Sequence, residues 1–167
     1  MATETSPQVA VVMGSDSDRK VMESCIEQLR EFGLTPAVRI ISAHRTPRVA
    51  AEFAETAESR GIQVIIAAAG MAAHLAGTMA AWTVLPVIGV PLAAEPGIGG
   101  LDALLSTVQM PPGVPVATVG IGKPGARNAA ILAVQILARS DPALRQKLIE
   151  FKKNQAQAVQ EKDAALG

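Results

Sequence analysis

The chain has 167 residues, 49% of them hydrophobic, and its 15 Lys and Arg residues balance its 15 Asp and Glu residues. This length fits one domain with a substantial core, since domains typically run to about 100–150 residues. A formal net charge of zero gives no basic field to attract a nucleic-acid backbone, and three Phe, one Trp and no Tyr leave few aromatic faces to stack bases. We therefore expect no nucleic-acid partner.

Cysteine content and the first residues bear on the compartment. The single cysteine, Cys25, excludes an intramolecular disulfide and fits a reducing compartment. Because it falls on the apolar face of a helical pattern, we interpret it as a packing residue. Residues 1–7 form a polar tail, and no apolar segment precedes the first apolar run at Val9. We expect no signal peptide, no membrane span and a cytoplasmic location.

Five short runs rich in Val and Ile predict the buried strands of a parallel sheet. They cover residues 9–13, 37–41, 64–69, 87–92 and 114–119. Helical patterns separate or follow these runs and cover residues 21–32, 47–60, 72–83, 101–108 and 126–139. The first two helices are expected to end at the capping glycines Gly33 and Gly61. This alternation predicts a single α/β domain of three layers, spanning residues 1–167, with right-handed crossovers.

A further helix is predicted over residues 141–163, outside the strand-helix alternation. Asp141 provides a capping side chain, and Pro142 occupies the first helical position. The apolar stripe consists of Leu144, Leu148 and Phe151, and the sequence then turns polar. This apolar stripe is narrow, so the helix could pack on its own domain or on a neighbouring subunit. The sequence leaves both possibilities open.

Ligands of a parallel α/β sheet bind at the carboxyl ends of its strands, where the loops share a crevice. Both histidines of the chain, His44 and His74, fall in these loops. In chain order the loops are GSDSD (14–18), SAHRTP (42–47), AGMAAHLAG (69–77), AAEPGIGG (93–100) and GIGKPGARN (120–128). We therefore expect the functional site among them.

The first two loops carry groups that bind phosphate. GSDSD opens a helix, so its amides and hydroxyls lie at the positive end of the helix dipole, although a plain capping turn has the same composition. Arg45, beside Ser42, adds a guanidinium that matches phosphate oxygens. Asp18 is too acidic for a phosphate and suits a ribose hydroxyl better. The two loops together indicate a small phosphorylated ligand.

His44 is the candidate for proton transfer, because imidazole titrates near neutral pH and general acid-base catalysis is its commonest use in a cleft. The alternative is a loop histidine with only structural hydrogen bonds. A zinc site needs more ligands than two distant histidines and one core cysteine supply, and no G-x-S-x-G nucleophile motif is present. We expect no metal and no covalent catalysis.

Several of these motifs, in this order, resemble one enzyme family. From Val9 to about Phe151 the chain is similar to the phosphoribosylaminoimidazole carboxylase catalytic subunit family, and specifically to its class I members, the N5-carboxyaminoimidazole ribonucleotide mutases. The resemblance is carried by GSDSD, SAHRTP, AGMAAHLAG, LPVIGVP, LLSTVQMPPGVPVAT and NAAILAVQILA. SAHRTP is the most specific, since the class II carboxylases usually have lysine where this chain has Arg45.

The resemblance implies a flavodoxin-like fold with a C-terminal helix at a subunit interface. It also implies an isomerase of purine (IMP) biosynthesis that moves a carboxylate from the exocyclic nitrogen to C4 and needs no cofactor. His44 would be the general acid and base, while Ser15, Asp18 and Arg45 would bind the ribose phosphate. The other expected substrate-binding residues are Ser42, Gly70, Met71, Ala72, His74 and Leu75. The implied partners are a ribonucleotide substrate, seven further copies in a homo-octamer with sites at subunit contacts, and an ATP-dependent synthetase that supplies the substrate.

The chain departs from the family pattern in the third loop. Met71 stands where glycine is usual, with bulk that can narrow or close the pocket, and Ala76 replaces the usual proline. Two other functions stay open. One is a class II carboxylase that uses free carbon dioxide, and the other is a non-catalytic flavodoxin-like module that binds a nucleotide or flavin. A phosphoacceptor domain is set aside, because the third strand has no aspartate at its end.

Overall fold

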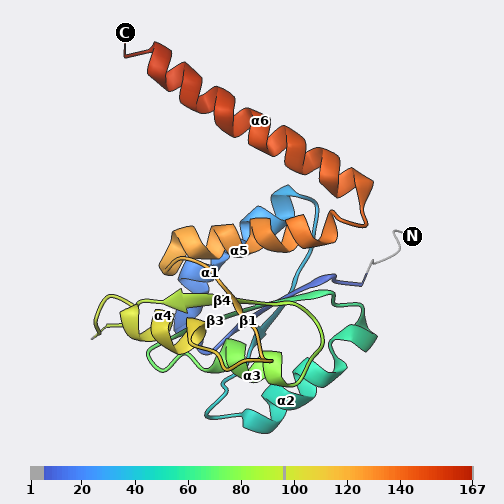
Figure 1. Cartoon of the computed structure of the whole chain (residues 1–167), viewed down its shortest axis with the longest axis vertical. Coiled ribbons are helices and arrows are strands. Elements are labelled where there is room, and N and C mark those ends of the chain that lie inside the picture. Colours follow the sequence, from blue (N-terminus) through green and yellow to red (C-terminus); the bar gives the residue numbers. More distant parts are fainter. Residues whose placement is uncertain (1–5, 96, 167) are drawn as a thin grey trace.

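The computed structural model describes residues 6–95 and 97–166. Its centre is a parallel sheet of five strands in the order β2-β1-β3-β4-β5 (Figure 1). The strands are β1 (Val9–Met13), β2 (Ala37–Ile40), β3 (Val64–Gly70), β4 (Val87–Leu92) and β5 (Ala117–Thr118). The predicted three-layer α/β fold is confirmed.

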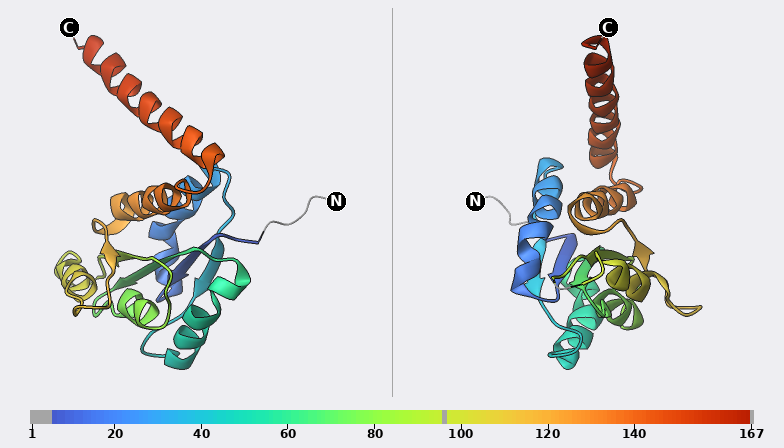
Figure 2. Two further views of the ribbon diagram at one scale, coloured as in Figure 1. Left: turned by 45° about the vertical axis from the view of Figure 1, so that its right-hand side comes forward. Right: turned by 90° about the vertical axis from the view of Figure 1, so that its left-hand side faces the viewer.

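Helices cover both faces of the sheet. They are α1 (Arg19–Glu31), α2 (Pro47–Thr56), α3 (Leu75–Ala81), α4 (Leu101–Val108), α5 (Gly122–Leu137) and α6 (Pro142–Ala164), with short 3-10 helices η1 (Asp16–Asp18) and η2 (Glu58–Arg60). Helices α1 and α5 pack together on one face, and α2 and α3 lie on the other (Figures 1 and 2). Helix α4 joins α3, since a Cβ placed at Gly89 of β4 would meet side chains from both helices.

The sheet separates two apolar cores, because successive residues of a strand point to opposite faces. Along β1, Val9, Val11 and Met13 contribute to the core beneath α1 and α5, whereas Ala10 and Val12 contribute to the core against α2 and α3. Cys25 of α1 is fully buried in the first core, as expected of a packing residue, and burial raises the pKa of its thiol to about 12. Both faces of the central strands are therefore covered by apolar side chains that exclude water.

The two edge strands are less buried than the sequence predicted. Ile40 of β2 is exposed, and neither residue of β5 is buried. β5 is also limited to Ala117–Thr118, so the prediction of a strand over 114–119 was wrong for most of its length. An edge strand has a neighbour on one side only, and Pro115 has no N–H to donate to the ladder.

Helix ends follow the predicted glycine caps. Gly33 has a φ of +85°, and the N–H of Leu34 donates to the carbonyl of Leu29 at 3.0 Å, which closes α1. Gly61, with a φ of +86°, follows η2, the tighter final turn of the second predicted helix. The largest differences in helix starts are those of α3, which begins at Leu75 instead of 72, and α5, which begins at Gly122 instead of 126.

Helix α6 leaves the body of the molecule (Figure 2). The Asp141 side chain accepts hydrogen bonds from two N–H groups of the first turn, as predicted. Leu144 and Leu148 are buried, and the Phe151 ring packs 5.3 Å from that of Phe32, centroid to centroid. Every described residue after Phe151 is exposed. In the part of the chain described, no helix is long and apolar enough to span a membrane.

Candidate active site

The loops after β1, β2 and β3 meet at the carboxyl ends of the strands around a cavity of about 520 Å³. All ten site residues expected from the sequence line it. The complete lining consists of Gly14, Ser15, Ser17, Asp18, Ser42, Ala43, His44, Arg45, Ala69, Gly70, Met71, Ala72, His74, Leu75 and Ala94. The fourth loop contributes only Ala94 among the residues described; Pro96 of that loop lies outside them. The fifth loop contributes none.

Hydrogen bonds within residues 15–18 hold the first loop in a turn. The N–H of Ser15 donates to Oδ2 of Asp18 at 3.0 Å, and the N–H of Ser17 lies 3.4 Å from Oγ of Ser15. The predicted capping turn is therefore present at the same place as the predicted anion site. Burial raises the pKa of the half-buried Asp18 carboxyl, and the hydrogen bond from Ser15 partly opposes this increase.

The SAHRTP loop is fixed by its serine and threonine. The Thr46 hydroxyl donates to the Ser42 carbonyl at 2.9 Å and accepts from the Ser42 N–H at 3.0 Å. This closed turn leads directly into α2, whose first residue is Pro47. It presents the intervening residues, His44 and Arg45, to the cavity.

Arg45 joins the first two loops. Its Nη2 donates to the carbonyl of Gly14 at 3.0 Å, and its Nε lies 3.4 Å from Oγ of Ser42. The sequence placed Arg45 beside Ser42 but gave no sign of the Gly14 contact, because a backbone acceptor leaves no residue-type signature. A guanidinium held in this way keeps further N–H donors for a ligand anion.

His44 and His74 form a pair between the second and third loops. Nε2 of His44 lies 2.8 Å from Nδ1 of His74, and the two rings meet edge to face at 78°. One nitrogen of the pair carries the shared proton and the other accepts it. His74, expected from the sequence among the substrate-binding residues, lines the cavity and also hydrogen-bonds to the candidate acid-base residue.

The third loop lines the cavity with the small residues Ala69, Gly70 and Ala72 and with the longer side chains of Met71, His74 and Leu75. A Cβ at Gly70 would lie 3.2 Å from the carbonyl oxygen of Leu92, so the close approach requires glycine. Met71 has a φ of +54°, a conformation that costs a non-glycine residue about 1–2 kcal/mol. Its side chain is 60% exposed, and the cavity remains open beside it. Of the two effects that the bulk of Met71 can have, narrowing or closing the pocket, closure does not occur.

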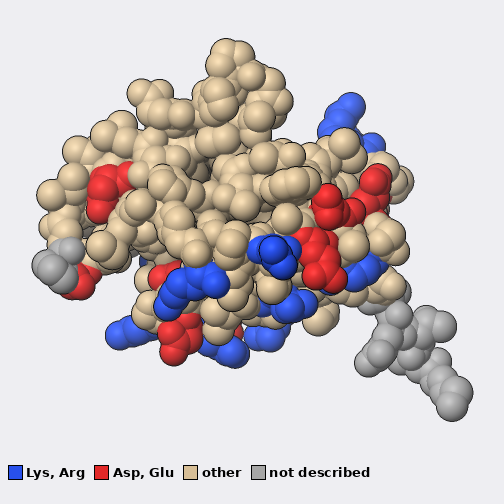
Figure 3. Space-filling view, turned by 90° about the horizontal axis from the view of Figure 1, so that it is seen from below, with Lys and Arg blue, Asp and Glu red and all other residues tan. Residues whose placement is uncertain are grey.

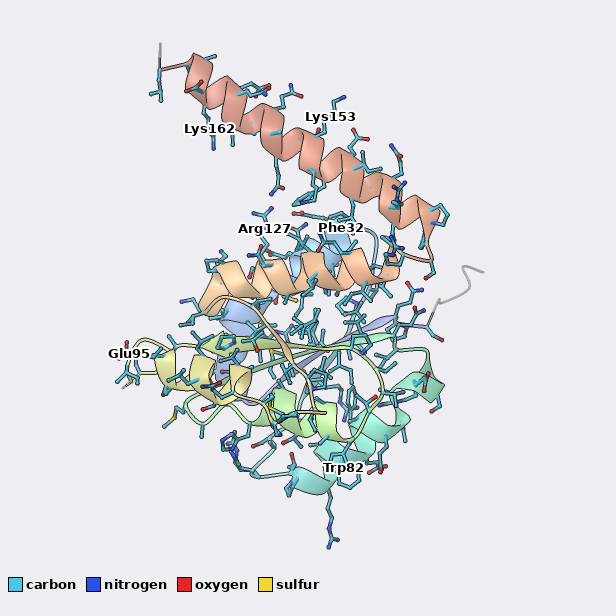
Figure 4. The ribbon with its side chains drawn as sticks, in the orientation of Figure 1. Phe32, Trp82, Glu95, Arg127, Lys153 and Lys162 are labelled. Atoms are coloured by element: carbon cyan, nitrogen blue, oxygen red, sulfur yellow. The ribbon has the colours of Figure 1, made fainter. Side chains whose placement is uncertain are left out.

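Two alternative ligand classes find little support in this geometry. Among the described residues, no group of three or more His, Cys, Asp or Glu side chains is placed to hold a metal ion. A flavin site needs aromatic rings, yet the cavity lining has no aromatic side chain besides the two histidines. Trp82 lies just after α3, half-exposed and outside the lining (Figure 4).

Charge on the surface is mixed. On the face shown in Figure 3, Lys and Arg side chains alternate with Asp and Glu, and a broad part of the face carries neither. No single-sign region extends across that face. In the described lining of the cavity, Arg45 is the one Lys or Arg side chain available to attract a phosphate.

Residues 8–158 match the family model described as AIR carboxylase. The chain belongs to this family. It is 54% identical over 160 residues to an N5-carboxyaminoimidazole ribonucleotide mutase of Mycobacterium leprae, covering 96% of this chain and 92% of the relative. The relative of that name from Bacillus subtilis is 52% identical over 155 residues, covering 93% and 95%.

A solved structure places the fold in the same family. The crystal structure of Treponema denticola PurE superimposes with a TM-score of 0.86 at 28% identity, covering 96% of this chain and 98% of that one. The predicted flavodoxin-like fold, with five parallel strands in the order β2-β1-β3-β4-β5, is confirmed for this chain. The likeness extends over nearly the whole of both chains.

Proposed function

We propose that this chain is an N5-carboxyaminoimidazole ribonucleotide mutase, an isomerase of purine biosynthesis. The observation that carries this proposal is identity above 50% to relatives of that name over more than nine-tenths of the chain. The cavity supports it, because the loops after β1, β2 and β3 bring all ten expected residues together.

The polar side of the cavity would bind the ribose phosphate. Ser15, Ser42 and Arg45 offer hydroxyl and guanidinium donors near the start of α1. Hydrogen bonds between such donors and a charged phosphate are shorter and stronger than neutral ones. Asp18 lies in the same group, where its carboxylate can accept a hydrogen bond from a ribose hydroxyl. The aminoimidazole ring then reaches toward the histidine pair.

Proton transfer by His44 accounts for the carboxylate migration. A protonated His44 gives its proton to the exocyclic nitrogen as the C–N bond of the carbamate breaks, and the bonding pair stays on that nitrogen. The products held in the site are carbon dioxide and aminoimidazole ribonucleotide. C4 of the ring then attacks the carbon dioxide, and His44 takes the C4 proton back. The cycle restores His44 and consumes no cofactor.

Residues 69–75 would hold the migrating carboxylate. Gly70, Met71 and Ala72 line the cavity close to the histidine pair. Within the described part of the chain, the N–H groups of Met71 and Ala72 are bonded to no other backbone carbonyl, so they can donate to a carboxylate. Ala43, Ala69 and Ala94 add apolar surface that favours an uncharged gas molecule over water.

A class II carboxylase is the second candidate, since the matching family model is described as AIR carboxylase. Arg45, the residue that favours the mutase by resemblance, is built into the cavity through Gly14 and Ser42. The relatives at more than 50% identity bear the mutase name. The mutase is therefore the better supported of the two.

We further propose that the enzyme works as a homo-octamer in the cytoplasm, with a synthetase supplying its substrate. Helix α4 carries an unpaired apolar face formed by Leu101, Leu105 and Val108, which recur at helical spacing. About 48% of the surface of each of these residues is exposed. The projecting α6, marked by Lys153 and Lys162 in Figure 4, also suits packing on a neighbouring subunit. Light scattering at micromolar concentration tests this assembly, and a monomer would contradict it.

The activity is tested by ultraviolet absorbance of 4-carboxyaminoimidazole ribonucleotide. The protein is mixed with aminoimidazole ribonucleotide and bicarbonate, with or without ATP and the synthetase that carboxylates the amine. A mutase gives product only with ATP and synthetase. Comparable rates without them would identify a carboxylase, and no product in either mixture would refute both assignments.

A further inference from the structure

We propose that the Met71 side chain is a shield that retains carbon dioxide in the active site between the two halves of the reaction. This inference rests on the proposed mutase function and assigns a role to a residue that departs from the family pattern.

The apolar part of the cavity lining is made almost entirely of alanine. Ala43, Ala69, Ala72 and Ala94 have no side chain long enough to reach across the opening. Leu75 is longer, but it is only 2% exposed and is fixed in the core against α2 and α3. Met71 is the one long apolar side chain of the described lining that solvent reaches, with 60% of its surface exposed.

The position of Met71 allows it to cover the reacting groups. It follows Gly70 at the end of β3 and precedes His74 by three residues, so it belongs to the loop that carries one ring of the histidine pair. Its thioether chain has three rotatable bonds and adapts to irregular surfaces. Folded over a bound aminoimidazole ring, it would replace water at the mouth of the cavity.

The backbone of Met71 points to a role at the site. Met71 is the only non-glycine residue with positive φ in the described chain. Glycine would adopt this conformation without strain, and strained residues of this kind concentrate at functional sites. A bulky side chain thus occupies a backbone conformation that favours glycine.

The chemistry supplies the reason. After the carbamate bond breaks, aminoimidazole ribonucleotide and carbon dioxide are both neutral at the reacting centre, and no bond joins them. Escape of the gas completes a different reaction, in which the carbamate takes one proton from His44 and gives amine and carbon dioxide. His44 then regains a proton from water. Met71 therefore changes the ratio between carboxylation at C4 and escape of carbon dioxide. It does not change the first step, the cleavage of the carbamate bond.

Three substitutions separate bulk from backbone strain. Met71→Leu keeps both bulk and strain, Met71→Ala keeps the strain without the bulk, and Met71→Gly removes both. The readout is aminoimidazole ribonucleotide released per 4-carboxyaminoimidazole ribonucleotide formed, after subtraction of the spontaneous loss measured with no enzyme. Thermal unfolding is measured in parallel on the same assembled protein.

We expect the release ratio to rise at least threefold in Met71→Ala and Met71→Gly and to stay within error of wild type in Met71→Leu. Only Met71→Gly should unfold at a higher temperature, by about 2–4 °C. An unchanged ratio in the alanine and glycine variants would overturn the shield, as would a ratio that follows stability instead of bulk. A wild-type protein that forms no product would refute the mutase function itself, which is a separate outcome.

Discussion

Nε2 of His44 lies 2.8 Å from Nδ1 of His74, although the two residues are separated by 30 positions in the chain. This contact joins the loop after β2 to the loop after β3 in the wall of the cavity that both residues line. Because one ring must donate and the other accept, each ring restricts the orientation and tautomer of the other. The proposed general acid and base is thus positioned by a second imidazole.

Replacing His44 by asparagine should abolish turnover without preventing ligand binding. General acid-base catalysis contributes roughly 10²–10⁴ in rate, so kcat should fall by about that factor. The donors proposed for the phosphate, Ser15 and Arg45, are untouched, so calorimetry should still detect binding of aminoimidazole ribonucleotide. Turnover close to the wild-type rate would place the base elsewhere.

Replacing His74 by phenylalanine should lower kcat by roughly tenfold and leave KM nearly unchanged. Phenylalanine keeps the edge-to-face ring contact but removes the hydrogen bond that fixes the tautomer of His44. His74→Asn, whose amide can donate or accept, should restore part of the rate. Initial rates over a range of substrate concentration separate the two constants. A rise in KM with normal kcat would show instead that His74 acts only in substrate binding.

Replacing Arg45 by alanine should raise KM more than it lowers kcat. A hydrogen bond to a charged group contributes roughly 1.5–3 kcal/mol, equivalent to a loss of binding of about 10- to 150-fold. Arg48→Ala is the matched control, since Arg48 is an exposed arginine of α2 outside the cavity lining. Equal effects of the two substitutions would contradict a specific role for Arg45.

Asp18 should make the stability of the protein depend on pH. Burial raises the pKa of its carboxyl above the ordinary value of 3.8. The unfolded state has the ordinary pKa and the folded state the raised one. At a pH between the two, the folded state keeps a proton that the unfolded state has lost, so the contribution of this group to stability falls as pH rises. Asp18→Asn carries no such charge.

Asp18→Asn should therefore gain stability relative to wild type between pH 4 and pH 7. Urea unfolding of both proteins at the two pH values measures this difference. If the free energy of unfolding of the wild type instead rose relative to that of the variant as pH rises, hydrogen bonds such as that from Ser15 would outweigh the desolvation of Asp18.

The sequence was enough to predict most of the fold because its signals are local. Val- and Ile-rich runs marked β1 and β4 to the residue, and Gly33 and Gly61 marked the ends of helical segments. The fifth strand was predicted too long, because an apolar run does not reveal that it lies at an edge. Its pairing depends on partners that only the folded sheet defines.

In the candidate site, too, local signals were predictable from the sequence and contacts between separate segments were not. Loop positions at strand ends predicted which residues would gather, and all ten lie around one cavity. The geometry among them was less accessible: the contact of Arg45 with the Gly14 carbonyl involves backbone, and the pairing of His44 with His74 depends on how two loops meet. The left-handed backbone of Met71 was not predicted, although Met71 stands where the family usually has glycine, the residue that adopts this conformation without strain.

The central claim is that the carboxylate stays in the site as it moves from nitrogen to C4. The most direct measurement uses N5-carboxyaminoimidazole ribonucleotide labelled with ¹³C in its carboxylate, in unlabelled bicarbonate, with the initial product examined by mass spectrometry. Our account predicts that most of the 4-carboxyaminoimidazole ribonucleotide formed carries the label. Product whose carboxylate has the isotopic composition of the surrounding bicarbonate would contradict it.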